Sequence, residues 1–228
     1  MSSDTRPPAS PTLFLTDDDV AALADLPSAI RAVRAAYPAP VDERRNPGRI
    51  FADSGREWQR TMPSVPSSGR LFGAKSINGS FADAGLRVSY LISLFDKRTA
   101  DLVALIDGNR VTGLRTAATS AVGAAAIAPE RPLALGVVGS GFEAQSHTLA
   151  LAEVVDIAEV RVFSPTPRNR AAFADRFTEE LGVPVRAVES AEAAVRDADL
   201  VLCAARSRDE TPTIDADWVA DDAAVVSI

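Results

Sequence analysis

Several residue types are scarce in this 228-residue chain, and each scarcity excludes a kind of chemistry. One cysteine, Cys203, and one histidine, His147, are too few ligands for a cysteine- and histidine-based zinc site, and a Ser–His–Asp mechanism would have His147 as its only histidine base, so we expect neither. A single cysteine also excludes a disulfide within the chain, and because Cys203 lies in an apolar run we expect a reduced, buried thiol. We expect His147 to pack in its helix or lie at the surface rather than bind a metal.

Basic residues are also fewer than acidic ones. The 24 Lys and Arg residues against 31 Asp and Glu give a formal net charge of −7, without the basic footprint of a nucleic-acid-binding protein. No run of about 18 apolar residues is present to span a bilayer. Residues 1–12 lack the apolar core of an export signal and predict a disordered tail. We therefore expect a cytoplasmic protein that binds neither nucleic acid nor membranes.

The most informative stretch that is present covers residues 133–145, L-A-L-G-V-V-G-S-G-F-E-A-Q. It begins with an apolar run typical of a strand buried on both faces of a parallel sheet, and a helix is expected from Phe142. Gly139 permits a tight turn, Gly141 allows backbone to approach a ligand, and Ala144 allows close helix–strand packing. The start of the helix, with its free N–H groups, favours a pyrophosphate, although a purely structural turn is the alternative. The predicted cofactor-binding residues here are Gly139, Ser140, Gly141, Phe142, Glu143 and Ala144.

From residue 133 onward, apolar runs alternate with helical patterns, which predicts parallel β–α units. Strands are expected at 133–138, 159–163, 183–188, 200–205 and 223–228, and helices from 142 to about 155, at 168–181 and at 191–196. These strands are fewer than a complete doubly wound sheet contains. The sequence therefore predicts an α/β fold with an incomplete Rossmann-type, dinucleotide-binding domain over residues 129–228, and a chain truncated in its C-terminal part.

The first half shows shorter, mixed elements, which predict an α+β domain over residues 13–128. Thr16 followed by three acids can cap a helix, which we expect at 20–26, with a second at 29–37. The proline-rich residues 38–48 predict a loop. Strands are expected at 50–51, 59–62 and 70–77, followed by an antiparallel hairpin of 87–95 with 101–106, and a helix of small residues from Thr112 to about Ala128.

Several motifs together resemble one family. D-G-N-R-V-T-G-L-R-T-A-A-T-S-A (107–121), L-G-V-V-G-S-G-F-E-A-Q-S-H (135–147), F-D-K-R-T (95–99) and G-A-K (73–75) are similar to the ornithine cyclodeaminase/mu-crystallin family. The resemblance covers roughly residues 13–228. It implies that the first domain binds substrate and forms a homodimer, while the second binds NADP or NAD. Members of the family are longer, so the resemblance places an active-site aspartate beyond the end of this chain.

The resemblance implies hydride transfer between a nicotinamide and the α-carbon of a small L-amino acid or its cyclic imine. The sequence leaves open whether the enzyme is a cyclodeaminase, an imine reductase or an alanine-type dehydrogenase. A non-catalytic, NADPH-binding protein like the family's crystallins is one alternative, and an inactive fragment is another. The presence of Arg115 and Lys75 favours an enzyme.

Three basic residues are candidates for the catalytic site. Arg115, expected in the first turn of its helix, can grip a carboxylate with two hydrogen bonds, and the resemblance implies that it holds the substrate's α-carboxylate. Lys75 lies among glycine and apolar residues that can desolvate it, and the resemblance implies substrate contact and proton transfer. Arg49 resembles a second carboxylate-binding arginine, with Arg45 or Arg44 as alternative counterparts. Exposed side chains without a function are the ordinary alternative for all three.

The end of the second strand indicates the cofactor's phosphate preference. NAD-binding proteins place an acid there, about 20 residues after the glycines, but this chain has F-S-P-T-P-R-N-R (163–170). The hydroxyls of Ser164 and Thr166 and the guanidinium groups of Arg168 and Arg170 can accept a 2′-phosphate instead. We therefore expect NADP, with NAD still possible because backbone alone can hold a ribose diol.

The fourth strand supplies the remaining expected cofactor contacts. Ligands lie at the carboxyl ends of strands in sheets of this kind. We therefore expect the chain at Ala205 and Ser207 to pass beside the cofactor and to contact it through backbone atoms.

Overall fold

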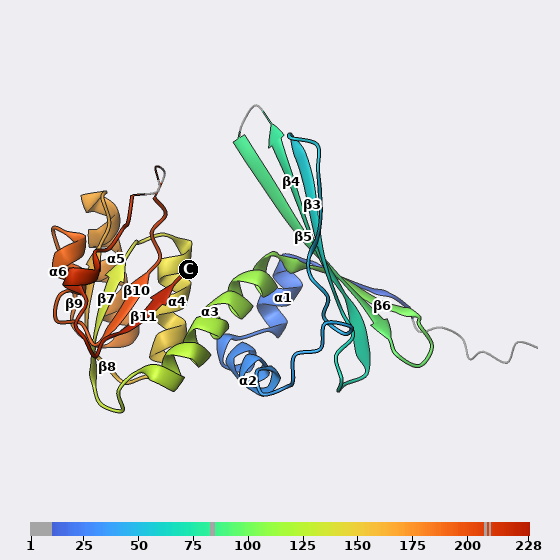
Figure 1. Cartoon of the computed structure of the whole chain (residues 1–228), viewed down its shortest axis with the longest axis horizontal. Coiled ribbons are helices and arrows are strands. Elements are labelled where there is room, and N and C mark those ends of the chain that lie inside the picture. The colour runs from blue at the N-terminus through green and yellow to red at the C-terminus, as the bar shows by residue number, and fades with distance from the viewer. Residues whose placement is uncertain (1–10, 83–84, 208, 210) are drawn as a thin grey trace, which may run out of the picture. The chain divides into compact units, whose positions relative to one another are not determined.

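The computed structural model describes residues 11–82, 85–207, 209 and 211–228, so residues 1–10 of the expected tail lie outside the described part. The chain divides into two compact units (Figure 1). The first contains the chain up to Asp25 and Tyr37–Thr112, and the second contains Leu26–Ala36 and Gly113–Ile228. The boundary between these units falls inside one helix, whereas the functional boundary expected after residue 128 stays a prediction.

The first unit contains a six-stranded sheet in the order β1-β6-β5-β4-β3-β2. Its strands are β1 (Leu13–Leu15), β2 (Ile50–Asp53), β3 (Glu57–Ser64), β4 (Leu71–Ala82), β5 (Gly85–Asp96) and β6 (Leu102–Asp107). The expected hairpin is confirmed as the antiparallel pair β5–β6. Strand β1, which we did not predict, pairs in parallel with β6, and Thr12 just before it donates a hydrogen bond to the Leu102 carbonyl (3.0 Å).

Helices α1 (Asp17–Leu23) and α2 (Leu26–Ala36) follow β1. As predicted, Thr16 caps α1: its hydroxyl accepts the Asp19 N–H (3.2 Å) and the Asp19 carboxylate accepts the Thr16 N–H (2.9 Å). Both helices begin earlier than expected. In α2 the reason is that Pro27 fits in the first turn, where a backbone N–H has no partner within the helix.

Asp96 closes the turn between β5 and β6. Its carboxylate accepts the N–H groups of Arg98 (2.7 Å) and Thr99 (3.3 Å) and pairs with the guanidinium of Arg70. The hydrogen bond from Arg70, followed by the bond from the Arg98 N–H, holds the pKa of Asp96 below its ordinary value. The turn is therefore stabilised by a carboxylate in its ionised form.

Replacing Asp96 by Asn tests that contribution. Because the folded-state pKa lies below the ordinary aspartate value of about 3.9, the carboxylate stabilises the fold above that pH and ceases to do so as the pH falls through the folded pKa. The melting temperature of Asp96→Asn should be lower than that of the natural protein at pH 7, and the two should converge below about pH 4. Melting curves that stay equally far apart from pH 7 to pH 3 would contradict this role.

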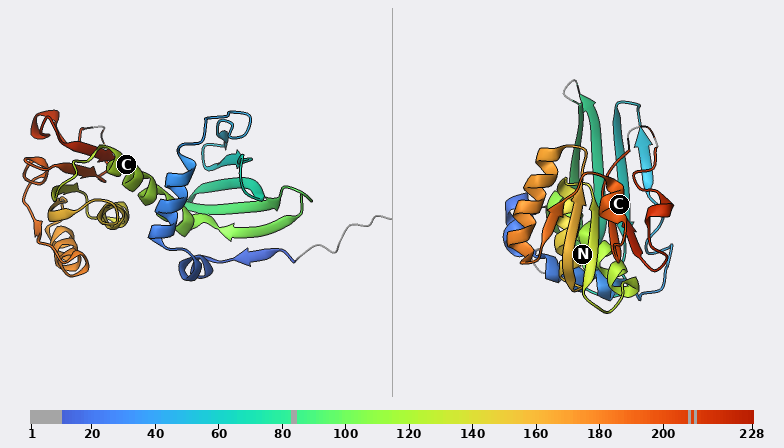
Figure 2. Two further views of the ribbon diagram at one scale, coloured as in Figure 1. Left: turned by 90° about the horizontal axis from the view of Figure 1, so that it is seen from below. Right: turned by 90° about the vertical axis from the view of Figure 1, so that its left-hand side faces the viewer.

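Five parallel strands form the sheet of the second unit, in the order β11-β10-β7-β8-β9, and run side by side in the right-hand view of Figure 2. The strands are β7 (Leu133–Val138), β8 (Ile157–Phe163), β9 (Val185–Ala187), β10 (Leu200–Cys203) and β11 (Ala224–Ser227). The helices that connect them are α4 (Phe142–Ala152), α5 (Pro167–Leu181) and α6 (Ala191–Val195), and a short 3₁₀ turn (Ala216–Trp218) precedes β11. The chain order reverses between β7 and β10, as in doubly wound dinucleotide-binding sheets. The α/β, Rossmann-type fold is thereby confirmed.

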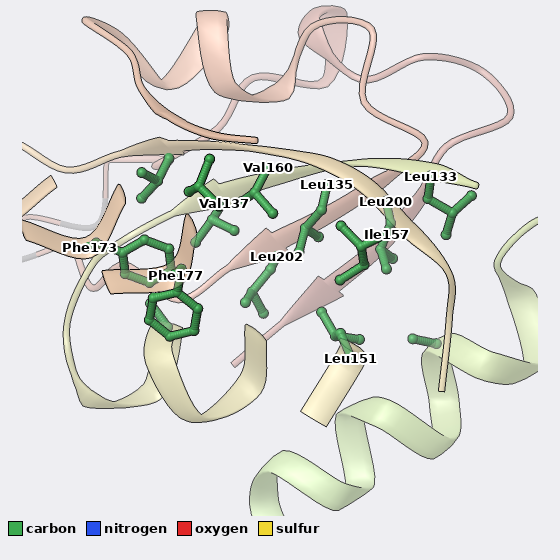
Figure 3. Close-up of a cluster of buried hydrophobic side chains, with 14 of the residues drawn as sticks. Leu133, Leu135, Val137, Leu151, Ile157, Val160, Phe173, Phe177, Leu200 and Leu202 are labelled. Carbon is green, nitrogen blue, oxygen red and sulfur yellow. The ribbon is translucent and has the colours of Figure 1, made fainter. Parts of the chain in front are cut away.

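Helices cover both faces of this sheet. Side chains of α3, α4 and α5 pack on one face, and Ala194 and Val195 of α6 pack on Val138 and Val201 on the other. Figure 3 shows the larger cluster. Its labelled members are Leu133, Leu135, Val137, Ile157, Val160, Leu200 and Leu202 from the strands, and Leu151, Phe173 and Phe177 from α4 and α5. This packing fixes the strand ends at which a ligand would bind.

Helix α3 (Gly108–Ile127) begins four residues before the expected Thr112. The Asp107 carboxylate at the end of β6 accepts the Asn109 N–H (2.9 Å), so the strand passes directly into a capped helix. Small residues allow close packing further along, where Ala117 and Ala121 are fully buried. Among the described residues, no helix is long and apolar enough to cross a membrane.

Candidate functional site

The turn after β7 requires glycine at Gly139. Its φ is +118°, and its N–H donates to the Phe163 carbonyl at the end of β8 (2.8 Å). A Cβ atom on this residue would lie 2.5 Å from the Ala204 carbonyl oxygen, which follows β10. The chain at Gly139 is therefore confined between the ends of the neighbouring strands, at the point where the strand order reverses.

The next glycine has the opposite surroundings. Gly141 is exposed, lies at the N-cap of α4 with φ −78°, and has no atom within 4 Å of where a Cβ would stand. It supplies no side-chain cap to α4, whereas Ala144 is fully buried beneath the helix. An eleven-residue helix thus begins without a side-chain cap and next to an exposed glycine, an arrangement that fits a pyrophosphate.

A hydroxyl pair links this turn to the end of β8. The Ser140 and Ser164 hydroxyls are 2.8 Å apart, and Ser164 is almost fully buried. The Ser164 carbonyl accepts a hydrogen bond from Arg170 (3.0 Å), whose guanidinium also pairs with Glu189. The sequence predicted that Arg170 binds a 2′-phosphate. Its guanidinium instead contacts the Ser164 carbonyl and Glu189 within the protein. Arg168, which follows Pro167 at the start of α5, is exposed.

The remaining predicted cofactor contacts lie around the same strand ends. Thr166 is exposed at the N-cap of α5, and Phe142 is 69% exposed at the start of α4. The Ala204 N–H donates to the Val138 carbonyl (2.8 Å), which brings the chain at Ala205 beside the glycine turn. Ser207 donates to the carboxylate of Asp209 (2.9 Å).

Glu143 lies over a buried histidine. Its carboxylate is 3.2 Å from Nε2 of His147, which has no exposed surface and packs in its helix, one of the two placements we expected. Burial lowers the pKa of His147 against the opposing attraction of Glu143. The buried imidazole therefore favours its neutral form.

Lys75 projects from β4 in the first unit. It lies between Met62 of β3 and Ile92 of β5, and its side chain is half-buried. Its Nζ is 3.4 Å from the Thr112 hydroxyl and 5.8 Å from the centre of the Tyr90 ring. Sequence reasoning missed Thr112 and Tyr90 as neighbours of Lys75, although Thr112 stood inside the recognised motif.

Arg49 directly precedes β2 and is exposed. Ile50 pairs with Thr61, so extending the register by one residue places Arg49 opposite Met62, the partner of Lys75. The alternative Arg45 pairs with Asp42 (3.2 Å) and bonds to the Val65 carbonyl (3.3 Å), so its side chain stabilises the loop. The side chain of Arg45 is thus engaged within the loop, and Arg49, which directly precedes β2, stays the candidate counterpart.

Arg115 lies at the start of the third turn of α3 and not in the first, because the helix begins at Gly108. The helix dipole acts mainly within the first turn, so a carboxylate at Arg115 would be attracted by the guanidinium rather than by the helix end. The side chain is exposed, while its backbone carbonyl accepts a hydrogen bond from Thr119 (2.8 Å).

The parallel sheet, the glycine turn at its reversal point and the uncapped helix define a Rossmann-type fold of the dinucleotide-binding class. Comparison with known families makes the assignment specific. Residues 12–228 match the ornithine cyclodeaminase/mu-crystallin family, and the chain belongs to that family.

Two characterised relatives illustrate the similarity. The mouse ketimine reductase mu-crystallin is 31% identical over 128 residues, which is 56% of this chain and 39% of the relative. The iminosuccinate reductase of Paracoccus denitrificans is 38% identical over 98 residues, 43% of this chain and 30% of that protein.

Solved structures extend the likeness over nearly the whole chain. An archaeal alanine dehydrogenase dimer with bound NAD superposes with a TM-score of 0.82 at 26% identity, over 94% of this chain and 66% of that one. The iminosuccinate reductase of Paracoccus denitrificans in complex with NAD⁺ gives 0.72 at 26% identity, over 84% of this chain and 61% of that one. In all four comparisons this chain spans less than two thirds of the relative's length.

Proposed function

We propose that the protein is a nicotinamide-dependent oxidoreductase that transfers hydride at the α-carbon of a small L-amino acid or its imine. The observation that carries the proposal is the uncapped start of α4, which lies behind Gly139 and Gly141 where the strand order reverses. The family supports an amino acid or imine as substrate, since relatives are named for imine reduction or alanine dehydrogenation. A cyclodeaminase cycle, in which the hydride leaves and later returns, stays within the proposal, since the family is also named for ornithine cyclodeaminase.

In this proposal the basic side chains have two roles, binding of the α-carboxylate and transfer of a proton. Arg49 and Arg115 hold the α-carboxylate and so orient the α-carbon. Arg115 lies on α3, three residues after Thr112. Lys75 takes the proton that the amino group loses on oxidation and returns it to the nitrogen on imine reduction. A bound nicotinamide supplies or accepts the hydride.

We further propose NADP as the cofactor, with NAD as the alternative. The end of β8 has no carboxylate for a ribose diol. Ser164, Thr166 and Arg168 follow that strand, and we assign them to a 2′-phosphate. The solved relatives with NAD or NAD⁺ bound keep the alternative open.

An arginine variant tests this preference. Arg168→Ala should raise the Kd for NADPH about tenfold or more, because a charge-assisted hydrogen bond is lost, and should leave the Kd for NADH almost unchanged. Calorimetric titration measures both constants. Arg176→Ala is the matched control, since it lies eight residues further along the same helix, about 12 Å away. An equal change for both cofactors would contradict 2′-phosphate binding by Arg168.

We also propose a homodimer and a cytoplasmic location. Exposed apolar side chains on the sheet of the first unit, including Ile50, Phe81 and Leu86, support self-association, and the alanine dehydrogenase relative is a dimer. Sedimentation of the natural protein at micromolar concentration would measure the mass of the assembly.

A melting screen tests the enzymatic proposal against a non-catalytic binder. A ligand that binds only the folded protein raises its melting temperature. NADPH or NADH should do so alone, and an amino acid or cyclic imine should add to the effect and turn over. Binding of NADPH without turnover of alanine, proline, ornithine, acidic amino acids or cyclic imines would favour the mu-crystallin-like, non-catalytic alternative.

A further inference from the structure

Arg60 shares the sheet face of Lys75. In the β3–β4 register Met62 lies opposite Lys75 and Arg60 lies opposite Ile77. Residues two apart on a strand point to the same face, so Arg60 is the diagonal neighbour of Lys75. Diagonal neighbours are about 7–8 Å apart, within reach of long side chains. Arg60 also lies opposite Phe51 of β2, so Phe51 shares this face with Arg60 and Lys75.

The guanidinium of Arg60 is held by aromatic rings. Its central carbon lies 5.5 Å from the centre of the Phe51 ring and 6.0 Å from that of Trp58. Trp58 lies across Gly79, where a Cβ would be 2.1 Å from the indole, so this glycine makes room for the ring. Stacking of this kind orients a planar cation and leaves its N–H edge available.

Arg60 has no acidic partner among the residues that the structure describes, and its side chain is half-buried. Asp53, the acid nearest to it in the register, accepts the Gly55 N–H (2.6 Å) within its own turn. Arg60 and Lys75 carry like charges on one face and repel one another, and an anion bound between them would relieve that repulsion.

We propose that Arg60 binds a second carboxylate, so that the substrate is a short dicarboxylic amino acid or the corresponding imine. This inference rests on the proposed function, which assigns Arg49 and Arg115 to the α-carboxylate and leaves Arg60 for the side-chain carboxylate. The diagonal spacing suits a substrate of four or five carbons. The reaction is unchanged: the α-carbon gives hydride to NADP⁺, the nitrogen gives a proton to Lys75, and the second carboxylate stays intact.

Substrate preference in the natural full-length protein tests the inference. With NADP⁺, kcat/KM for L-aspartate or L-glutamate should exceed that for L-alanine and L-norvaline at least tenfold. Arg60→Met should lower kcat/KM for the acidic substrate about 100-fold and change that for the uncharged ones less than threefold. Arg87→Met is the matched control, because Arg87 pairs with Ser80 on the opposite face of the same sheet, and it should change neither value.

A binding measurement separates this inference from the proposed function. Succinate, an inert dicarboxylate, should raise the melting temperature of the natural protein and of Arg87→Met but not of Arg60→Met. A preference for uncharged substrates, or equal losses for both classes in Arg60→Met, would overturn the role of Arg60 while hydride transfer stands. If no amino acid turns over, the proposed function fails, and the succinate shift alone shows whether Arg60 binds a dicarboxylate.

Discussion

Lys75→Ala should lower kcat about 100-fold or more while the Kd for NADPH stays within about threefold of that of the natural protein. The reason is position: Lys75 lies on the sheet of the first unit beside Thr112, whereas the glycine turn belongs to the second unit. Removing the ammonium removes the group that we propose to exchange a proton with the substrate nitrogen. Steady-state kinetics and fluorescence titration with NADPH measure the two quantities.

The only other lysine provides the control. Lys97 donates hydrogen bonds to the carbonyls of Pro66, Ser68 and Gly69. Lys97→Ala should therefore lower the melting temperature and leave kcat nearly unchanged. Lys75→Ala should show the reverse. Equal losses of turnover and cofactor affinity in Lys75→Ala would contradict its assignment as a proton-transfer residue.

Gly139→Ala should destabilise the second unit by about 2–6 kcal/mol, the sum of the cost of a positive φ and of overpacking in a buried site. Both costs follow from the geometry, since φ is +118° and the new Cβ would lie 2.5 Å from the Ala204 carbonyl oxygen. The oxygen belongs to backbone and cannot rotate away. Thermal melting measures the loss, and NADPH should bind weakly or not at all.

Gly141→Ala is the matched control for that variant. Its φ is ordinary and its Cβ meets open space, so stability should fall by about 1 kcal/mol or less. The methyl group would occupy the space in front of α4, so the Kd for NADPH should rise about tenfold or more. Unchanged cofactor affinity in Gly141→Ala would show that no phosphate lies against this turn.

The sequence predicted some elements to the residue and missed others for physical reasons. The strand at 133–138 was predicted without error because its burial on both faces leaves a continuous apolar run. Strand β1 has only three residues, too few to show a period of two. The start of α3 was placed too late because Asp107 ends a strand and caps a helix at once.

The sequence likewise revealed some residues of the candidate site and missed others. Local motifs were enough to single out the glycine turn, Lys75 and Arg115 as candidates. They could not reveal that Arg170 is bound to the Ser164 carbonyl and Glu189, because Glu189 lies beyond the end of the intervening helix. Arg60 was missed because its place beside Lys75 depends on the register of two strands, which a single sequence does not specify.

Transfer of a deuterium label from NADPH to the substrate is the sharpest test of hydride transfer at the α-carbon. The natural full-length protein would be incubated with a cyclic or acidic α-imino acid and NADPH that carries deuterium at the nicotinamide C4, and the product would be analysed by mass spectrometry. We expect an L-amino acid with one deuterium on its α-carbon, and we expect the rate of its formation to fall about 100-fold in Lys75→Ala. Saturable NADPH binding without deuterium in any amino acid product would contradict it.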